Sequence, residues 1–135
     1  MPRHRFVEHT GELELHLHAA DLAALFEEAA RALAQTMAED ARGAPTQPEA
    51  HVEITSADRE TLLVDWLNEL VGRAEIEKCV YWDVHVTRAN DTHLEATVRG
   101  RAPTSPRTAV KAATWHRVRV SPTPTGVDAT IVLDV

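Results

Sequence analysis

A row of carboxylates and imidazoles near the N-terminus is the part of the sequence best suited to chemistry. Within residues 8–18, polar and apolar side chains alternate: Glu12, Glu14, His16 and His18 against Leu13, Leu15 and Leu17. A period of two is typical of a half-buried strand. One face of this strand is therefore expected to build core, whereas the other presents groups that can bind metal. Gly11 allows the backbone to turn sharply into the strand.

The two histidines of this row lead to a zinc hypothesis. Residues two apart in a strand share a face, so His16 and His18, with Glu14, could bind one Zn²⁺. A further ligand would come from a neighbouring strand, and His85 and His116 are the candidates. This hypothesis describes a zinc-dependent metalloenzyme. No second metal-ligand motif accompanies it, and polar alternation alone explains the same residues. No Ser-His-Asp signature, phosphate-binding glycine loop or paired cysteine motif indicates another enzyme class.

Length, composition and charge are those of one ordinary globular domain. The chain has 135 residues, of which 44% are hydrophobic and 26% charged, so a single domain over residues 1–135 is expected. No apolar run approaches the ~20 residues needed to cross a bilayer and no signal peptide is visible, so we expect a cytoplasmic protein without membrane contact. The net charge of −7 opposes tight binding to nucleic acid, which needs clustered Lys and Arg. A protein partner fits this charge better.

Periodicity predicts two amphipathic helices and about six or seven strands. Apolar residues three and four apart indicate helices over residues 22–38 and after Asp58, each behind an aspartate N-cap. Alternation predicts strands at 3–8, 12–18, 51–55, 80–86, 94–98, 110–120 and 127–135. Residues 41–49 and 100–108 are expected to be loops, and Pro122, Pro124 and Gly126 a turn. The predicted class is α+β, a largely antiparallel sheet or sheets with both helices packed on them.

The tryptophans and the single cysteine are assigned from the same patterns. Trp66 lies in the apolar stripe of the second helix and Cys79 in an apolar strand, so both are expected in the core. Trp82 and Trp115 fit either the core or a partner-binding surface. Along residues 110–120, alternation predicts that one face is shared by Lys111, Ala113, Trp115, Arg117 and Arg119.

Four blocks of sequence form a more specific pattern when taken together. They are residues 6–12 (Phe-Val-Glu-His-Thr-Gly-Glu), residues 25–30 (Leu-Phe-Glu-Glu-Ala-Ala), residues 62–70 (Leu-Leu-Val-Asp-Trp-Leu-Asn-Glu-Leu), and residues 110–116 (Val-Lys-Ala-Ala-Thr-Trp-His) followed by residues 131–135 (Ile-Val-Leu-Asp-Val). Each block alone is common, but their order and spacing hold over essentially the whole chain. In this combination the chain resembles the archease family, small proteins that assist GTP-dependent RNA ligases of the tRNA-splicing type.

The resemblance implies a divalent-cation site built from both ends of the chain. In archeases the acidic residue after the His-Thr pair, the penultimate Asp and the final residue gather around a cation, and a late-strand Lys serves ligase activation. In this sequence the corresponding positions are Glu12, Asp134, Val135 and Lys111, with Glu8 and His9 as further candidates. Ca²⁺ is the expected ion, ahead of Mg²⁺ or Mn²⁺, because hard cations prefer oxygen ligands. Pairing the first long strand with the last would bring Glu12 to Asp134.

Three positions depart from the family pattern. Glu8 and Glu12 stand where the family has aspartates, and Gly11 replaces an alanine. The added methylene moves a carboxylate oxygen by about a bond length, which Ca²⁺–oxygen distances of ~2.3–2.6 Å do not absorb automatically. Gly11 could give the backbone the freedom to re-aim Glu12. The alternative is a weaker site or one selective for another ion.

The resemblance also implies a function without catalysis by this chain. An archease-like protein would activate an RNA ligase by promoting its guanylylation and multiple turnover, and it would carry no catalytic residue of its own. Two alternatives stay open beside it. One is the zinc metalloenzyme built on Glu14, His16 and His18, and the other is a metal-free interaction or chaperone-like domain.

Overall fold

Two antiparallel sheets and two helices make up the structure, a computed structural model that describes residues 2–135 apart from the side chain of His9. In chain order the elements are β1 (Arg3–His9), β2 (Glu12–Ala19), α1 (Leu22–Met37), β3 (Ala50–Thr55), α2 (Arg59–Glu77), β4 (Val80–Ala89), β5 (His93–Arg101), β6 (Ala112–Thr123) and β7 (Gly126–Asp134). The predicted α+β class, with seven strands and two helices, is confirmed.

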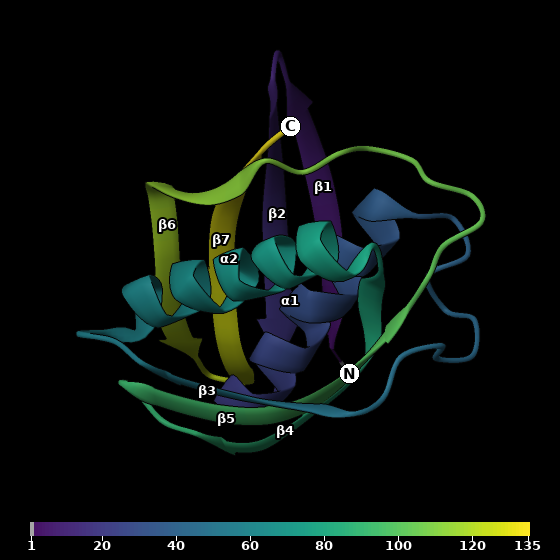
Figure 1. The fold of residues 1–135 in the computed structure, drawn as a ribbon. Helices are drawn as coiled ribbons and strands as arrows, with labels where there is room; N and C mark the ends of the chain where they lie inside the picture. Colours follow the sequence, from purple (N-terminus) through teal and green to yellow (C-terminus); the bar gives the residue numbers. More distant parts are fainter. Residues whose placement is uncertain (1) are drawn as a thin grey trace.

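The strands form one sheet of four and one of three. The larger sheet has the order β1-β2-β7-β6 and the smaller one β3-β5-β4. Every pairing in both sheets is antiparallel. Figure 1 shows both helices lying across the four-stranded sheet, with the three-stranded sheet below them. Within the described residues neither helix is long and apolar enough to cross a membrane.

Both helices begin at the aspartates that the sequence indicates. The Asp21 carboxylate accepts a hydrogen bond from the Ala24 amide at 2.8 Å, and Asp58 accepts one from the Thr61 amide at the same distance. These bonds satisfy amides that the first helical turn leaves without a partner. The second helix ends at Lys78, whose φ of 54° is left-handed and stops further helical hydrogen bonding.

The core assignments of Trp66 and Cys79 are confirmed. Trp66 is fully buried, and its indole Nε1 donates a hydrogen bond to the Phe26 carbonyl at 2.9 Å, which joins α2 to α1. Cys79 is 3% exposed. Trp82 is half-buried with the Arg42 guanidinium 4.8 Å from its ring centroid. Trp115 remains 58% exposed, which makes it available to a partner.

Strand β6 corrects the predicted shared face. The register pairs Ala113 with Leu133 on the core side but Arg119 with Thr130 on the outer side, with a shift between Thr114 and Arg119. Inside this irregularity Arg117 has a φ of 58°, so a bulge reverses the alternation. Ala113 is consequently buried, whereas Trp115, Arg117 and Arg119 are exposed.

The limits of β6 also differ from the prediction. The strand begins at Ala112, two residues late, and runs through Pro122 instead of turning there. Since β6 is the outermost strand of its sheet, a proline without an amide hydrogen can be accommodated in it. The turn into β7 is correspondingly shorter than predicted.

The contact between Gly100 and Cys79 gives a stability prediction. A Cβ at Gly100 would lie 2.5 Å from the Cys79 sulfur, so Gly100→Ala should lower the free energy of unfolding by about 1–3 kcal/mol through overpacking. Gly72→Ala is the matched control, because a Cβ there meets nothing within 4 Å in the middle of α2. That variant should gain about 0.5–1 kcal/mol from helix propensity. Urea unfolding checks both, and equal effects would contradict the packing argument.

Candidate functional site

The register between β2 and β7 brings the start of β2 to the C-terminal end of the chain. Glu12 lies directly opposite Asp134. Two backbone hydrogen bonds continue the contact, since the Lys111 amide donates to the Asp134 carbonyl at 2.8 Å and the Val135 amide donates to the Gly11 carbonyl at 3.2 Å. The four residues that the resemblance implied, from both ends and the start of β6, therefore meet at one end of the large sheet. Their role as ligands stays a prediction.

A cleft of about 400 Å³ opens at this end of the sheet, and its floor and walls come from four parts of the chain. It is lined by Phe6, Glu8, Glu12, Leu13, Gln35, Thr36, Arg107, Thr108 and Val135. The cleft thus includes three of the predicted residues, Glu8, Glu12 and Val135. Lys111 and Asp134 lie beside it and are exposed. The side chain of His9 is outside the described residues.

The predicted acidic residues do not all share one side of the sheet. Directly opposed residues of an antiparallel pair point to the same face, so Glu12 and Asp134 belong together. Glu8 instead lies opposite Leu13, which packs against the core on the helix side. Among the described residues, these acidic side chains do not form a group of three within ligand distance. Their oxygen donors suit a hard cation, but other ligands would have to complete its shell.

The segment of residues 102–111 forms one wall of the cleft because it is fastened to the end of α1. The Arg107 amide donates to the Met37 carbonyl at 2.9 Å, and the Thr108 amide donates to the Thr36 carbonyl at 3.1 Å. These bonds continue a short bridge between Ala38 and Pro106. Sequence reasoning identified a loop here but missed that it brings a guanidinium to the cleft that holds Glu8. No periodic signal marks such a loop.

Asp40 holds the other end of the same segment. Its carboxylate accepts hydrogen bonds from the Thr104 amide at 2.8 Å, the Thr104 hydroxyl at 3.0 Å and the Ser105 amide at 3.1 Å. Arg101 adds an ion pair at 3.3 Å. The Thr104 amide contributes most to holding the pKa of the Asp40 carboxyl well below its usual range. Asp40 is therefore ionised and fixes the loop at neutral pH.

Asn68 positions the beginning of β6 beside Lys111. Its side-chain amide donates to the Ala113 carbonyl at 3.0 Å, and its carbonyl oxygen accepts from the Ala113 amide at 2.8 Å. This pair of bonds imitates a neighbouring strand and ties β6 to α2.

The residues of the zinc hypothesis are divided between separate pairs. His16 Nε2 lies 2.8 Å from a Glu14 carboxylate oxygen, and His18 Nδ1 lies 2.5 Å from an oxygen of Asp128. Glu14 also contacts the guanidinium of Arg117 at 3.5 Å. Among the described residues, Glu14, His16 and His18 do not converge on a common point. The two further ligands suggested by the sequence are also apart: His116 is exposed on β6, and His85 is exposed on β4 of the other sheet.

Fold and site together define a small α+β protein of two antiparallel sheets, with an acidic cleft where the hairpin of β1 and β2 meets the C-terminal residue. The model of the archease protein family matches residues 4–135, so the chain belongs to the archease family. Protein archease of Methanosarcina mazei is 28% identical over 141 residues, covering 98% of this chain and 96% of the relative. That of Archaeoglobus fulgidus is 31% identical over 137 residues, with 98% and 99% covered.

Solved structures support the same fold. The solution structure of protein 1598 from Methanobacterium thermoautotrophicum has a TM-score of 0.77 and 28% identity, with 98% of each chain covered. A crystal structure from Thermotoga maritima, described as an archease and possible chaperone, has a TM-score of 0.67 at 18% identity, covering 96% of this chain and 94% of that one.

The lowered pKa of Asp40 predicts how the loop responds to acid. A depressed pKa means that the contribution to stability is present above the unfolded value of about 3.9 and is lost as pH falls through the folded value. Asp40→Asn removes the titrating group. Between about pH 5 and pH 3, the variant should therefore lose less stability than the unmodified protein. Urea unfolding midpoints at both pH values measure this, and parallel losses would show that Asp40 does not carry the effect.

Proposed function

We propose that this protein is a non-catalytic activator of a GTP-dependent RNA ligase in tRNA splicing or RNA repair. It promotes guanylylation of the ligase and so allows the ligase to turn over repeatedly. The partner is the ligase protein, and RNA is not bound tightly by this chain, whose net charge is −7. Membership of the archease family supports the proposal.

The single observation that carries the proposal is the register of β2 against β7. It sets Glu12 opposite Asp134, and the Asp134 carbonyl binds the amide of Lys111. The backbone of Lys111 thus lies beside two residues that carry carboxylates, at an exposed strand end. This strand end is suited to contact the ligase site that binds nucleotide and metal, because phosphoryl transfer depends mainly on positioning and charge stabilisation.

Lys111 and the neighbouring Trp115 also suit contact with a protein partner. Both side chains are exposed, and both belong to or adjoin the edge strand β6, which Asn68 holds in place. Large aromatic groups and cations at a rigid edge are typical of interface centres. Edge strand β6 therefore supplies the docking surface, and the carboxylates of Glu12 and Asp134 supply negative charge that faces the ligase site.

A divalent cation completes the proposal. Glu12, Asp134 and the main-chain oxygens of Val135 offer hard donors, which favours Ca²⁺, Mg²⁺ or Mn²⁺ over softer ions. When bound, such an ion supplies positive charge for phosphate oxygens. Among the described residues these side chains do not form a group of three within ligand distance, so ligands from the ligase or its nucleotide would complete the coordination shell.

Multiple-turnover ligation by the cognate ligase, with and without this protein, tests the function. Lys111→Ala and Asp134→Asn should each remove most of the stimulation while leaving thermal unfolding unchanged, because both side chains are exposed. Lys78→Gly is the control for charge, because it removes the second of the two lysines in the chain. Glycine readily adopts the left-handed φ of this position, so the fold should tolerate the change. This variant should stimulate normally.

Two results would count against the proposal. Full stimulation by Lys111→Ala would show that the site is elsewhere. If this protein raises ligation only by preventing aggregation of the ligase, and single-turnover guanylylation is unchanged, the metal-free, chaperone-like alternative is favoured.

The cation is tested separately by calorimetric titration of the chelator-treated protein with Ca²⁺. Glu12→Gln and Asp134→Asn should each weaken binding by about tenfold or more, because each removes one charged oxygen ligand. Asp128→Asn changes an exposed carboxylate of the same strand and should bind as the unmodified protein does. Glu12→Asp measures the effect of the extra methylene. Unchanged binding by Glu12→Gln would exclude Glu12 as a ligand.

A further inference from the structure

The outer face of the three-stranded sheet carries a cluster of side chains of the types that bind metals. These residues belong to the sheet that does not contain Glu12 and Asp134. Strand β3 contributes His51 and Glu53, and β5 contributes His93 and Glu95. Each strand thus presents a His-x-Glu sequence. Because the strands are antiparallel and Glu53 is the register partner of Glu95, the two carboxylates meet in the middle with one imidazole on each side.

Two carboxylates placed directly opposite each other are unfavourable unless a cation lies between them. A basic residue is close at hand, since Arg88 of β4 is the register partner of Glu95 on its other side. Among the described ion pairs, however, Glu95 and Glu53 both contact His93, whose Nε2 is 3.6 Å and 3.3 Å from their oxygens. Both carboxylates therefore turn toward the imidazole, and the strand pairing holds them there.

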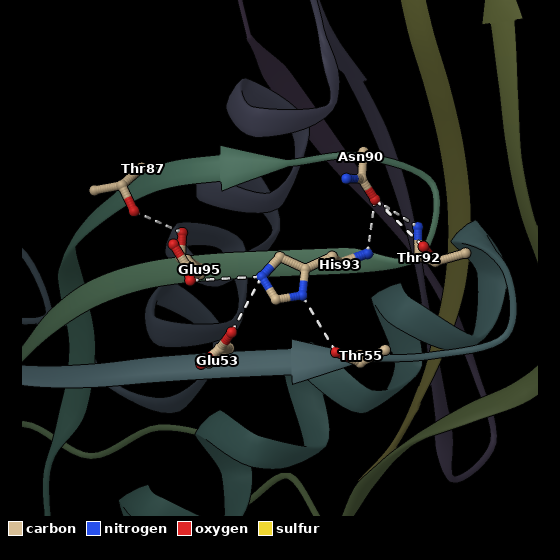
Figure 2. Close-up of polar contacts among 7 residues, drawn as sticks. All are labelled: Glu53, Thr55, Thr87, Asn90, Thr92, His93 and Glu95. Carbon is tan, nitrogen blue, oxygen red and sulfur yellow. Dashed lines mark hydrogen bonds and ion pairs between the residues drawn. The ribbon is translucent and has the colours of Figure 1, made fainter.

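These separations are longer than hydrogen bonds and are compatible with ligands of one metal ion. An N–H···O hydrogen bond spans about 2.7–3.2 Å, which is shorter than both contacts. Two atoms bound to one tetrahedral Zn²⁺ at ~2.1 Å are separated by ~3.4 Å. Figure 2 shows the His93 ring between the two glutamates, with Nε2 facing both. Potential ligand atoms of His51, Glu53 and Glu95 also lie within 4.8 Å of one another, so each imidazole has the same two glutamates beside it.

The support around His93 is that of a metal-ligating histidine. Its Nδ1 lies 3.2 Å from the Thr55 hydroxyl, so this hydroxyl can fix the tautomer that leaves Nε2 free. The His93 amide donates to the Asn90 side-chain oxygen at 2.9 Å, as Figure 2 also shows. Backbone and ring are both held before any ion arrives. Such preorganisation lowers the cost of binding.

We propose that His51, Glu53, His93 and Glu95 form a binding site for one borderline transition-metal cation, with Zn²⁺ as the expected ion. Two imidazole nitrogens and two carboxylate oxygens are a complete tetrahedral donor set for Zn²⁺. Ca²⁺ and Mg²⁺ are disfavoured because they require oxygen ligands. With four protein ligands the site is structural. The ion links edge strand β3 to β5, so it stabilises the small sheet and is independent of the ligase-activating end.

Isothermal titration of the chelator-treated protein with ZnCl₂, together with thermal unfolding, tests this site. The unmodified protein should bind one equivalent and unfold at a higher temperature with Zn²⁺. Glu53→Gln and Glu95→Gln should weaken binding at least about tenfold, since loss of even a supporting residue has that effect. His93→Ala should do the same. All three substitutions lie on a sheet surface, so the variants should fold without metal. Thermal unfolding without Zn²⁺ checks this.

Two control variants separate this site from the others. His16→Ala removes an imidazole from the other sheet, and Glu12→Gln removes a carboxylate from the cleft. Both should bind Zn²⁺ and be stabilised by it as the unmodified protein is. No binding by the unmodified protein, equal binding by Glu53→Gln and Glu95→Gln, or loss of binding in His16→Ala would each overturn the proposal.

Discussion

The antiparallel pairing of β2 with β7 is the constraint on which the rest of the structure depends. It is a central pairing of the large sheet, and it buries Leu15 against Ile131 while Glu12 and Asp134 meet at its end. A slip of one residue would send every core side chain of β2 to the outer face, so burial fixes the register. The same register that builds the core thereby determines which acidic residues are neighbours.

Polar clamps then arrange the chain around this pairing. Asp40 fixes the loop that walls the cleft, and Asn68 fixes the start of β6 next to Lys111. Both act on backbone amides that no strand partner satisfies, which is why each carries several hydrogen bonds. Stability and site geometry are thus linked through two side chains that are not themselves among the predicted ligands.

The sequence predicts elements whose apolar residues recur with a regular period, but it does not predict features that depend on how strands are aligned with one another. Helices α1 and α2 could be predicted because apolar spacing and the caps Asp21 and Asp58 agree. The bulge around Arg117 could not, because nothing in the local alternation announces a reversal. The meeting of Glu12 with Asp134 was anticipated through the resemblance. The cluster on β3 and β5 was missed, since its two His-x-Glu sequences become one site only when the strands pair Glu53 with Glu95.

The two ligand clusters differ in chemistry, and this difference would keep their ions apart. The cleft offers oxygen donors in an open arrangement, which suits a hard cation that keeps water or accepts ligands from a partner. The outer face of the small sheet offers nitrogen and oxygen donors together, and in the proposed four-ligand site these would suit Zn²⁺ and leave no position for a substrate. An ion in the second cluster would therefore act on stability alone. The end of β2 and β7 is the place where, under the proposed function, this member of the archease family would contact the ligase.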